Sequence, residues 1–133
     1  MKPIILIFIV FLLDQFTKYF FYGNNFDLIP GIFGITSTTN TGALFGILKG
    51  YNLILIFVSL AIIFLCFKWL KDRSFHYIPL SFIIGGAFGN LIDRLIFGFV
   101  RDFLDFKIWP VFNFADAFIT IAIFLIVYKE VRK

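Results

Sequence analysis

Long apolar stretches separated by short polar ones dominate this chain of 133 residues. Residues 3–22, 51–70, 78–100 and 112–128 are each apolar enough, over a sufficient length, to predict a helix that crosses a membrane. The composition agrees, because 61% of the residues are hydrophobic and 15% are charged, whereas about a quarter are charged in a soluble domain. We therefore expect an all-α membrane protein, one domain over residues 1–133, with four spans.

Residues 23–50, between the first two predicted spans, have a different pattern. From residue 28 to residue 38 apolar side chains alternate with glycine and β-branched residues, which predicts short strands or a hairpin at the membrane interface. Residues 40–46 (NTGALFG) fit either a short amphipathic helix lying on the membrane or an ordinary glycine turn. We expect a small extracytoplasmic β or loop segment that includes a short interfacial helix.

The basic residues predict how the spans are oriented. Four spans place both termini on one side, together with the turn at residues 71–77. Seven basic residues lie on that side and three on the other: Lys2, Lys68, Lys71, Arg73, Lys129, Arg132 and Lys133 against Lys49, Arg101 and Lys107. Since short cytoplasmic loops carry the excess of Lys and Arg, we expect both termini in the cytoplasm. No small-residue cleavage site follows the first apolar run, which predicts a retained span.

The third predicted span contains a polar cluster near its end. On a helix, Asn90, Asp93 and Arg94 stand at i, i+3 and i+4 and share one face. Gly85 and Gly89 form a small-xxx-small pair, which allows a neighbouring helix to approach closely. An ionisable residue inside a span is a functional-site hypothesis by default.

Polar residues of the other segments fall at the same depth. Asn113 and Asp116 share a face at the start of the fourth span, and Asn40 comes from the outer loop. Asp14 and Lys18 form an i, i+4 pair in the outer half of the first span. That pair fits a role in a site and equally fits mutual neutralisation with Lys18 snorkelling to the interface. All charges within the spans therefore lie in the outer half of the membrane.

Two facing carboxylates at this depth suggest an acid–base pair. At about 4 Å, with an effective dielectric near 20, like charges repel by roughly 4 kcal/mol, so Asp93 and Asp116 would share one proton near neutral pH. One carboxylate would then activate water and the other would protonate the substrate carbonyl, as in aspartic proteases. Asn90, Asn113 and Arg94 would orient the carboxylates or the substrate. This chemistry requires no metal and no organic cofactor.

Other site types find little support in the sequence. His76 is the only histidine and has no second ligand, so a metal site is not expected. The chain has no HExxH and no GxSxG motif. Cys66 lies in an apolar run and is expected to pack, and Asp102 and Asp105 are expected to be solvated loop or cap residues. Without a basic run that includes aromatics, nucleic acid is not an expected partner.

Two alternatives to an enzyme stay open at this point. Carboxylates near Lys and Arg in membrane spans also mark proton-coupled transporters. However, no polar path continues into the inner half of the spans. A structural scaffold would use Asp93–Arg94 and Asp14–Lys18 as internal pairs, although Asp116 has no basic partner in its own helix.

Five sequence blocks, taken in order, resemble the bacterial lipoprotein signal peptidases, the type II signal peptidase family of membrane aspartic proteases. The blocks are DQFTK (14–18), NTGALFG (40–46), GGAFGNLIDR (85–94), VRDFLDF (100–106) and FNFADAFI (112–119). Together they extend from the first predicted span to the last. Leu44 stands where the family usually has the smaller alanine, so the outer loop is expected to differ in shape from that of the family.

The resemblance implies an enzyme of the bacterial cytoplasmic membrane with its active site toward the outer leaflet. It implies removal of the signal peptide from diacylglyceryl-modified prolipoproteins, just before the lipidated cysteine, and sensitivity to globomycin-type inhibitors. Its implied catalytic residues are Asp93 and Asp116. The residues that it implies for substrate binding or site support are Asp14, Lys18, Asn40, Gly42, Asn90, Arg94, Asn113 and Ala115.

Overall fold

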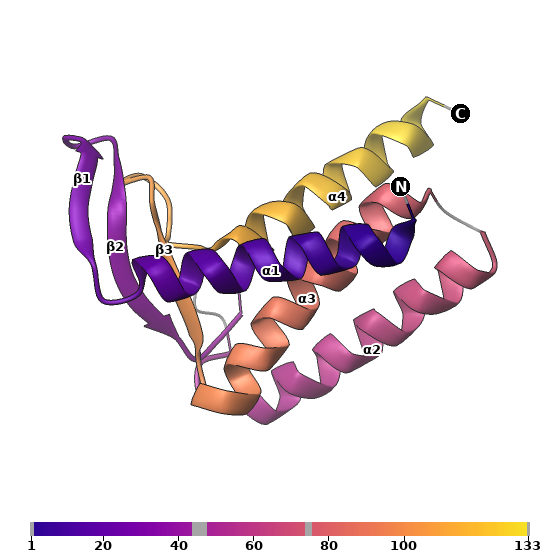
Figure 1. Cartoon of the computed structure of the whole chain (residues 1–133), viewed down its shortest axis with the longest axis horizontal. Helices are drawn as coiled ribbons and strands as arrows, with labels where there is room; N and C mark the ends of the chain where they lie inside the picture. The colour runs from indigo at the N-terminus through magenta and orange to yellow at the C-terminus, as the bar shows by residue number, and fades with distance from the viewer. Residues whose placement is uncertain (1, 44–47, 74–75, 133) are drawn as a thin grey trace.

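Four helices and a three-stranded antiparallel sheet make up the computed structural model, which describes residues 2–43, 48–73 and 76–132. The helices are α1 (Pro3–Phe21), α2 (Asn52–Lys71), α3 (Tyr77–Phe97) and α4 (Phe114–Val131). The strands are β1 (Asn25–Ile29), β2 (Phe33–Asn40) and β3 (Val100–Asp105), in the order β1-β2-β3. The helices run side by side, with both termini at one end and the sheet at the other (Figure 1).

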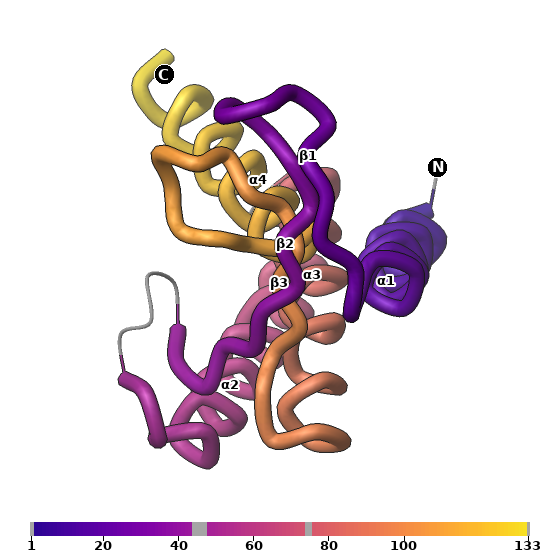
Figure 2. Tube along the Cα trace, turned by 90° about the vertical axis from the view of Figure 1, so that its left-hand side faces the viewer, coloured from indigo at the N-terminus to yellow at the C-terminus, as the bar shows by residue number. Residues whose placement is uncertain are grey.

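Helix α3 is the central element of the bundle. The other three helices surround it and pack against it (Figure 2). Its apolar core with α1 and α2 consists of Ile7, Ile63, Cys66, Leu80, Ile84, Ala87 and Leu91. Cys66 is buried in this core, as the sequence predicts.

Glycines on α3 allow this close packing. A Cβ atom at Gly85 would lie 2.7 Å from the Val10 Cβ of α1, and a Cβ atom at Gly89 would overlap the Asp14 carboxylate. On the side toward α4, a Cβ atom at Gly86 would lie 2.8 Å from the Ala115 carbonyl oxygen. The small-xxx-small prediction is therefore confirmed, with α1 as the partner helix.

Large apolar side chains cover the outside of the bundle. Phe8 of α1, Phe64 of α2 and Phe124 of α4 are 60%, 70% and 71% exposed. Helices α1, α2 and α3 are long and apolar enough to cross a membrane. Helix α4 has 18 residues. The exposed apolar surface suits hydrocarbon, and helices satisfy their backbone groups internally, as a bilayer requires.

The segment after α3 differs from the sequence prediction. Helix α3 ends at Phe97, earlier than the predicted residue 100, because Gly98 adopts the left-handed conformation (φ +79°) that terminates helices. Residues 100–105 then form β3, which pairs with β2 and was expected to be a loop. The molecule is thus a helical membrane protein with a sheet, and the all-α description is too narrow.

The outer segment agrees in part with prediction. The hairpin β1–β2 confirms the expected strands. The expected interfacial helix over residues 40–46 is not found in its described part, because Asn40 ends β2 and residues 41–43 form bends. The rest of that predicted helix, residues 44–46, lies outside the described residues.

Candidate active site

Lys18 lies at the centre of a buried polar cluster between α1 and α3. Its ammonium Nζ is 2.8 Å from Asp14 Oδ2 and 3.5 Å from Asp93 Oδ2, and all three side chains are fully buried. It also donates a hydrogen bond of 2.9 Å to Asn90 Oδ1. The snorkelling alternative for Lys18 is therefore wrong, because its charge is held by groups of α1 and α3 rather than by water.

Asp14 joins the same cluster to α4. Its Oδ1 accepts a hydrogen bond of 2.9 Å from the Ala115 backbone N–H. That N–H belongs to the first turn of α4, where backbone donors have no partner within the helix. Asp14 thus fixes the start of α4 against α1, and Ala115 takes part through its backbone.

Asp93 is bound by Arg101 rather than by its neighbour Arg94. Asp93 Oδ2 accepts from the Arg101 backbone N–H at 2.9 Å and from Nε at 3.1 Å, and Oδ1 accepts from Nη2 at 2.8 Å. Gln15 Nε2 adds a hydrogen bond of 3.2 Å to Oδ1. Arg101, which the sequence places in an outer loop, is in fact a buried residue of β3.

Asp116 lies in the first turn of α4, where it forms a capping box with Asn113. The Asn113 side chain accepts from the Asp116 N–H at 3.0 Å, and the Asp116 carboxylate accepts in return from the Asn113 N–H at 3.4 Å. Asn90 Nδ2 donates to Asp116 Oδ1 at 3.0 Å. Lys18 and Asn90 therefore lie between Asp93 and Asp116, and the described contacts include no hydrogen bond that joins these two carboxylates directly.

Asp102 is the buried carboxyl that the sequence analysis expected in solvent. It is 2% exposed and accepts a hydrogen bond of 2.6 Å from Asn113 Nδ2. Burial, and next the negative charge of Asp116, raise the pKa of Asp102 to about 7, although hydrogen bonds from Asn113 and Asn40 act in the opposite direction. The prediction of a solvated loop residue is wrong because β3 folds inward over the start of α4.

Arg94 connects α3 to the loop after β2. Its Nη2 donates to the Gly42 carbonyl oxygen at 2.9 Å, and the Gly42 N–H donates to Asn40 Oδ1 at 2.9 Å. The buried Arg94 Nε has no hydrogen-bond partner among the described residues. A buried N–H of a cation without a partner is costly, so this atom is ready to bond to a ligand oxygen.

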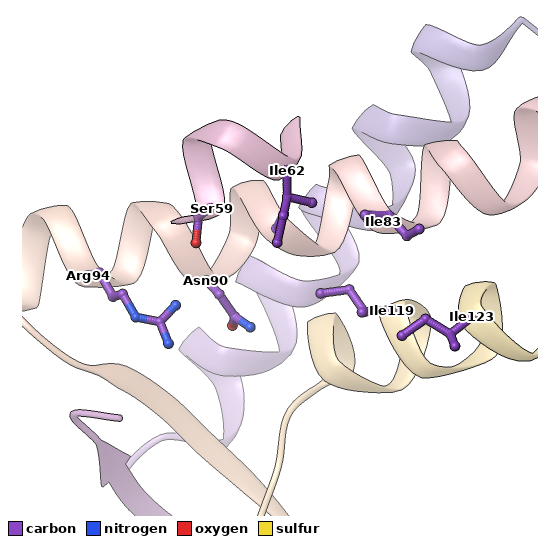
Figure 3. A pocket seen from close by; sticks show the side chains of 8 residues that line it. Ser59, Ile62, Ile83, Asn90, Arg94, Ile119 and Ile123 are labelled. Atoms are coloured by element: carbon purple, nitrogen blue, oxygen red, sulfur yellow. The ribbon is translucent and has the colours of Figure 1, made fainter. Parts of the chain in front are cut away.

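Asn90 and Arg94 line a cavity between α2, α3 and α4. It has a volume of about 250 Å³, and the other lining residues are Ser59, Ile62, Ile83, Ala87, Ile119 and Ile123. Figure 3 shows Asn90 and Arg94 on one side of α3 and the isoleucines of α4 facing the same space. Most of the lining is apolar, and its polar side chains are Asn90 and Arg94 of α3 and Ser59 of α2.

A second cavity lies beside Asp116, between α4 and the segment that precedes it. Its volume is about 300 Å³, and Trp109, Phe112, Ala117, Thr120 and Ile121 line it with Asp116. Asp116 is thus partly accessible, whereas Asp93 is fully buried. Across the described ranges, no group of three or more His, Cys, Asp or Glu side chains is arranged to hold a metal ion.

Comparison with known proteins assigns the chain to a family. A family model described as Signal peptidase (SPase) II matches residues 6–132. The chain belongs to the signal peptidase II family. The resemblance of the five sequence blocks is confirmed by this match.

Named relatives of the family cover nearly all of the chain. A lipoprotein signal peptidase of Halothermothrix orenii is 44% identical over 93% of this chain and 92% of its own length. One of Caldicellulosiruptor bescii is 43% identical over 97% of this chain and 90% of its own. As a member of the signal peptidase II family, this protein is a protease of the aspartic class.

Solved structures agree with this fold. A bacterial membrane enzyme solved by the in meso method at 2.3 Å resolution superposes with a TM-score of 0.91 and 32% identity, over 98% of this chain and 87% of its own. A second, at 1.9 Å resolution, has a TM-score of 0.83 and 34% identity, over 96% and 90%. The helices and the sheet are therefore features shared with membrane enzymes.

The site of this signal peptidase II combines predicted residues with residues that the sequence analysis missed. All ten predicted residues lie in or beside the polar network: Asp14, Lys18, Asn40, Gly42, Asn90, Asp93, Arg94, Asn113, Ala115 and Asp116. The missed residues are Gln15, Arg101 and Asp102. Gly98 was the available signal, since a glycine after a helical run marks its end and frees the next residues for a strand.

Proposed function

We propose that this signal peptidase II removes the signal peptide from diacylglyceryl-modified prolipoproteins, cutting just before the lipidated cysteine. The relatives named lipoprotein signal peptidase support this substrate class. The observation that carries the reaction type is that Asn113 hydrogen-bonds to two carboxyls: its Nδ2 donates to Asp102 of β3 at 2.6 Å, and its backbone N–H donates to Asp116 of α4 at 3.4 Å. No cofactor enters the proposed reaction.

The contacts favour Asp102 and Asp116 as the catalytic pair. Both residues are hydrogen-bonded to Asn113, and burial together with the charge of Asp116 raises the pKa of Asp102 to about 7, so one proton is available to the pair at neutral pH. The sequence instead predicts Asp93 as the second carboxyl. Asp93 accepts three hydrogen bonds from Arg101, one from its backbone and two from its guanidinium, and lies 3.5 Å from the Lys18 ammonium. Both carboxylate oxygens of Asp93 therefore already have hydrogen-bond donors.

In the proposed reaction, Asp116 acts first as the base. It accepts a proton from a water molecule as the water oxygen attacks the scissile carbonyl carbon, and Asp102 gives its proton to the carbonyl oxygen. The tetrahedral diol then collapses: its hydroxyl returns a proton to Asp102, the C–N bond breaks, and Asp116 gives its proton to the leaving amine. Both carboxyls end in their starting states.

Arg94 and Asn90 are suited to hold the substrate beside this pair. The Arg94 Nε has no hydrogen-bond partner among the described residues, and the Arg94 side chain lines the cavity of about 250 Å³. We assign this cavity to the apolar segment of the signal peptide, with a backbone carbonyl of the substrate accepting from Arg94. Globomycin-type inhibitors would compete for the same cavity.

The topology of the proposed enzyme follows the positive-inside rule. All four helices cross the cytoplasmic membrane, including α4, with both termini inside and the sheet outside. The placement of both termini at one end of the bundle supports an even number of crossings (Figure 1). The carboxyls then lie toward the outer leaflet, in contact with membrane lipid, at the depth of a lipid-anchored cysteine. The polar network is confined to one end, which disfavours a transporter.

Cleavage of a lipidated prolipoprotein peptide by purified variants tests this proposal. Asp102→Asn and Asp116→Asn should each lower kcat by about 10²–10⁴-fold, the usual contribution of general acid–base catalysis. Asp93→Asn should retain more activity than either. If folded Asp102→Asn cuts normally and Asp93→Asn is inactive, the catalytic pair is Asp93 and Asp116 instead. An inert wild type in suitable lipid would refute the substrate assignment.

A further inference from the structure

Arg101 carries a buried positive charge in strand β3, directly before Asp102. The residue is 9% exposed, and its side chain takes no part in the proposed proton transfers. We infer that Arg101 is a positioning residue: through Asp93 it fixes β3 so that Asp102 stands beside Asp116. This inference rests on the proposed roles of Asp102 and Asp116.

The first support is that one carboxylate holds both the backbone and the side chain of Arg101. Asp93 accepts from the backbone N–H at 2.9 Å and from two guanidinium nitrogens at 3.1 Å and 2.8 Å. A bidentate guanidinium–carboxylate pair fixes orientation as well as distance. The third bond, from the main chain, fixes the strand itself relative to α3.

The second support is that the guanidinium is also held from two other directions. Its Nη2 donates to Gln15 Oε1 of α1 at 3.0 Å, and its Cζ lies 4.7 Å from the centre of the Phe97 ring at the end of α3. Gln15 in turn donates to the Gly89 carbonyl oxygen at 3.0 Å. Arg101 is therefore restrained by α1 and α3 together, and its strand has little freedom to move at this point.

The alternation of a β-strand transmits this restraint to the catalytic pair. Successive residues of a strand point to opposite faces, so Asp102 points away from the side of β3 that Arg101 occupies. There it meets Asn113 at 2.6 Å. Because a displacement of about 1 Å in a reacting group can cost about 10²-fold in rate, fixing β3 at Arg101 bears directly on the position of the Asp102 proton.

A purely stabilising role explains this arrangement less well. Buried ion pairs contribute little net stability, because desolvation offsets much of their attraction, and their better attested use is to specify one arrangement. Here Lys18 also lies 3.5 Å from Asp93, so Asp93 keeps a positive neighbour when Arg101 is replaced. Replacing Arg101 should therefore increase the mobility of β3 while the protein stays folded.

The test compares Arg101→Met, Arg101→Lys and the wild type on a lipidated prolipoprotein peptide, with kcat and KM measured per folded protein in the same lipid. We expect kcat to fall by about 10–100-fold in Arg101→Met and by less in Arg101→Lys, with KM within about two-fold in both, because Arg94 and its cavity are untouched. Lys107→Met is the matched control: it removes an exposed cation just after the same strand, paired with Asp27 and Asp105, and should leave kcat unchanged.

The outcomes separate this inference from the proposed function. A folded Arg101→Lys with wild-type kcat overturns the inference. A folded Arg101→Met with wild-type kcat, changed only in KM or in thermal stability, overturns it too. If Arg101→Met does not fold, Arg101→Lys decides alone. If Asp102→Asn is inactive while both Arg101 variants cut normally, the catalytic pair stands and only the positioning role fails. An active Asp102→Asn refutes the proposed pair itself.

Discussion

Adjacent residues of this protein serve different parts of the site. Asp93 binds Arg101 of β3, whereas Arg94 binds the Gly42 carbonyl oxygen of the loop after β2. Helical spacing correctly places Asn90, Asp93 and Arg94 on one face of α3. It does not identify their partners, because these lie in other elements: Arg101 is in β3, beyond the end of the helix, and Gly42 is in the loop after β2. Because Asp93 is bound by Arg101, we propose Asp102 in place of Asp93 as the second catalytic carboxyl.

The raised pKa of Asp102 predicts a pH-dependent stability. The folded protein keeps the Asp102 proton up to about pH 7, whereas the unfolded chain releases it near pH 4, the ordinary value for Asp, about three units lower. Proton binding therefore favours the folded state at low pH, and this contribution is lost as the pH rises through about 7. Asp102→Asn should lose less thermal stability than the wild type between about pH 5 and about pH 8.

Thermal unfolding in detergent at the two pH values measures this effect. Lys107→Met serves as the control, because it changes an exposed charge just after the same strand and leaves Asp102 intact. An equal loss of Tm in Asp102→Asn and in the wild type would show that Asp102 is ionised throughout this range.

At the scale of elements, two features of α3 determine how the site is built. Gly85, Gly86 and Gly89 allow α1 and α4 to approach α3 closely, which brings Asp14 and Asp116 to the level of Asn90. Gly98 ends the helix and allows β3 to fold back over α4. The spacing of Gly85 and Gly89 predicts the close helix packing from the sequence. The helix end at Gly98 is harder to predict, because apolar residues continue on both sides of that glycine.

The substitution Gly89→Ala tests the close approach of α1. On an isolated helix this change favours folding by up to about 1 kcal/mol. Here the new Cβ atom would overlap the Asp14 carboxylate, so we expect a lower Tm and a loss of activity as Asp14 moves from Lys18 and Ala115. Ile96→Ala, at an exposed position of the same helix, is the control and should change Tm little. A Gly89→Ala variant as stable and active as the wild type would contradict the packing described for α1.

At the scale of the whole molecule, the polar groups gather at the end of the bundle that bears the sheet. The opposite half is held by an apolar core that includes Ile7, Ile63 and Leu80. This asymmetry fits a reaction near one surface of the membrane. It also leaves most of the helical surface apolar and available to lipid.

Labelling of single cysteines tests the proposed orientation. In a Cys66→Ala background, Ile108→Cys lies at a 96% exposed position after β3, and Arg132→Cys lies just after α4. A membrane-impermeant maleimide should label Ile108→Cys in intact cells, and Arg132→Cys only after the membrane is opened. Labelling of both positions in intact cells would refute the fourth crossing, and the reverse pattern would refute the orientation.

The sequence by itself determined the helical segments, the small-residue face of α3, the hairpin after α1 and the polar residues of the candidate site. These follow from local periodicity, from glycine spacing and from the cost of placing a charge in hydrocarbon, all of which act over a few residues. Only the tertiary structure decided that β3 exists, that Arg101 is buried against Asp93, and that Asp102 is buried and hydrogen-bonded to Asn113. Those facts depend on strand pairing and on burial by distant segments, and a charged residue after a helix has the same local pattern whether it ends in water or in the core.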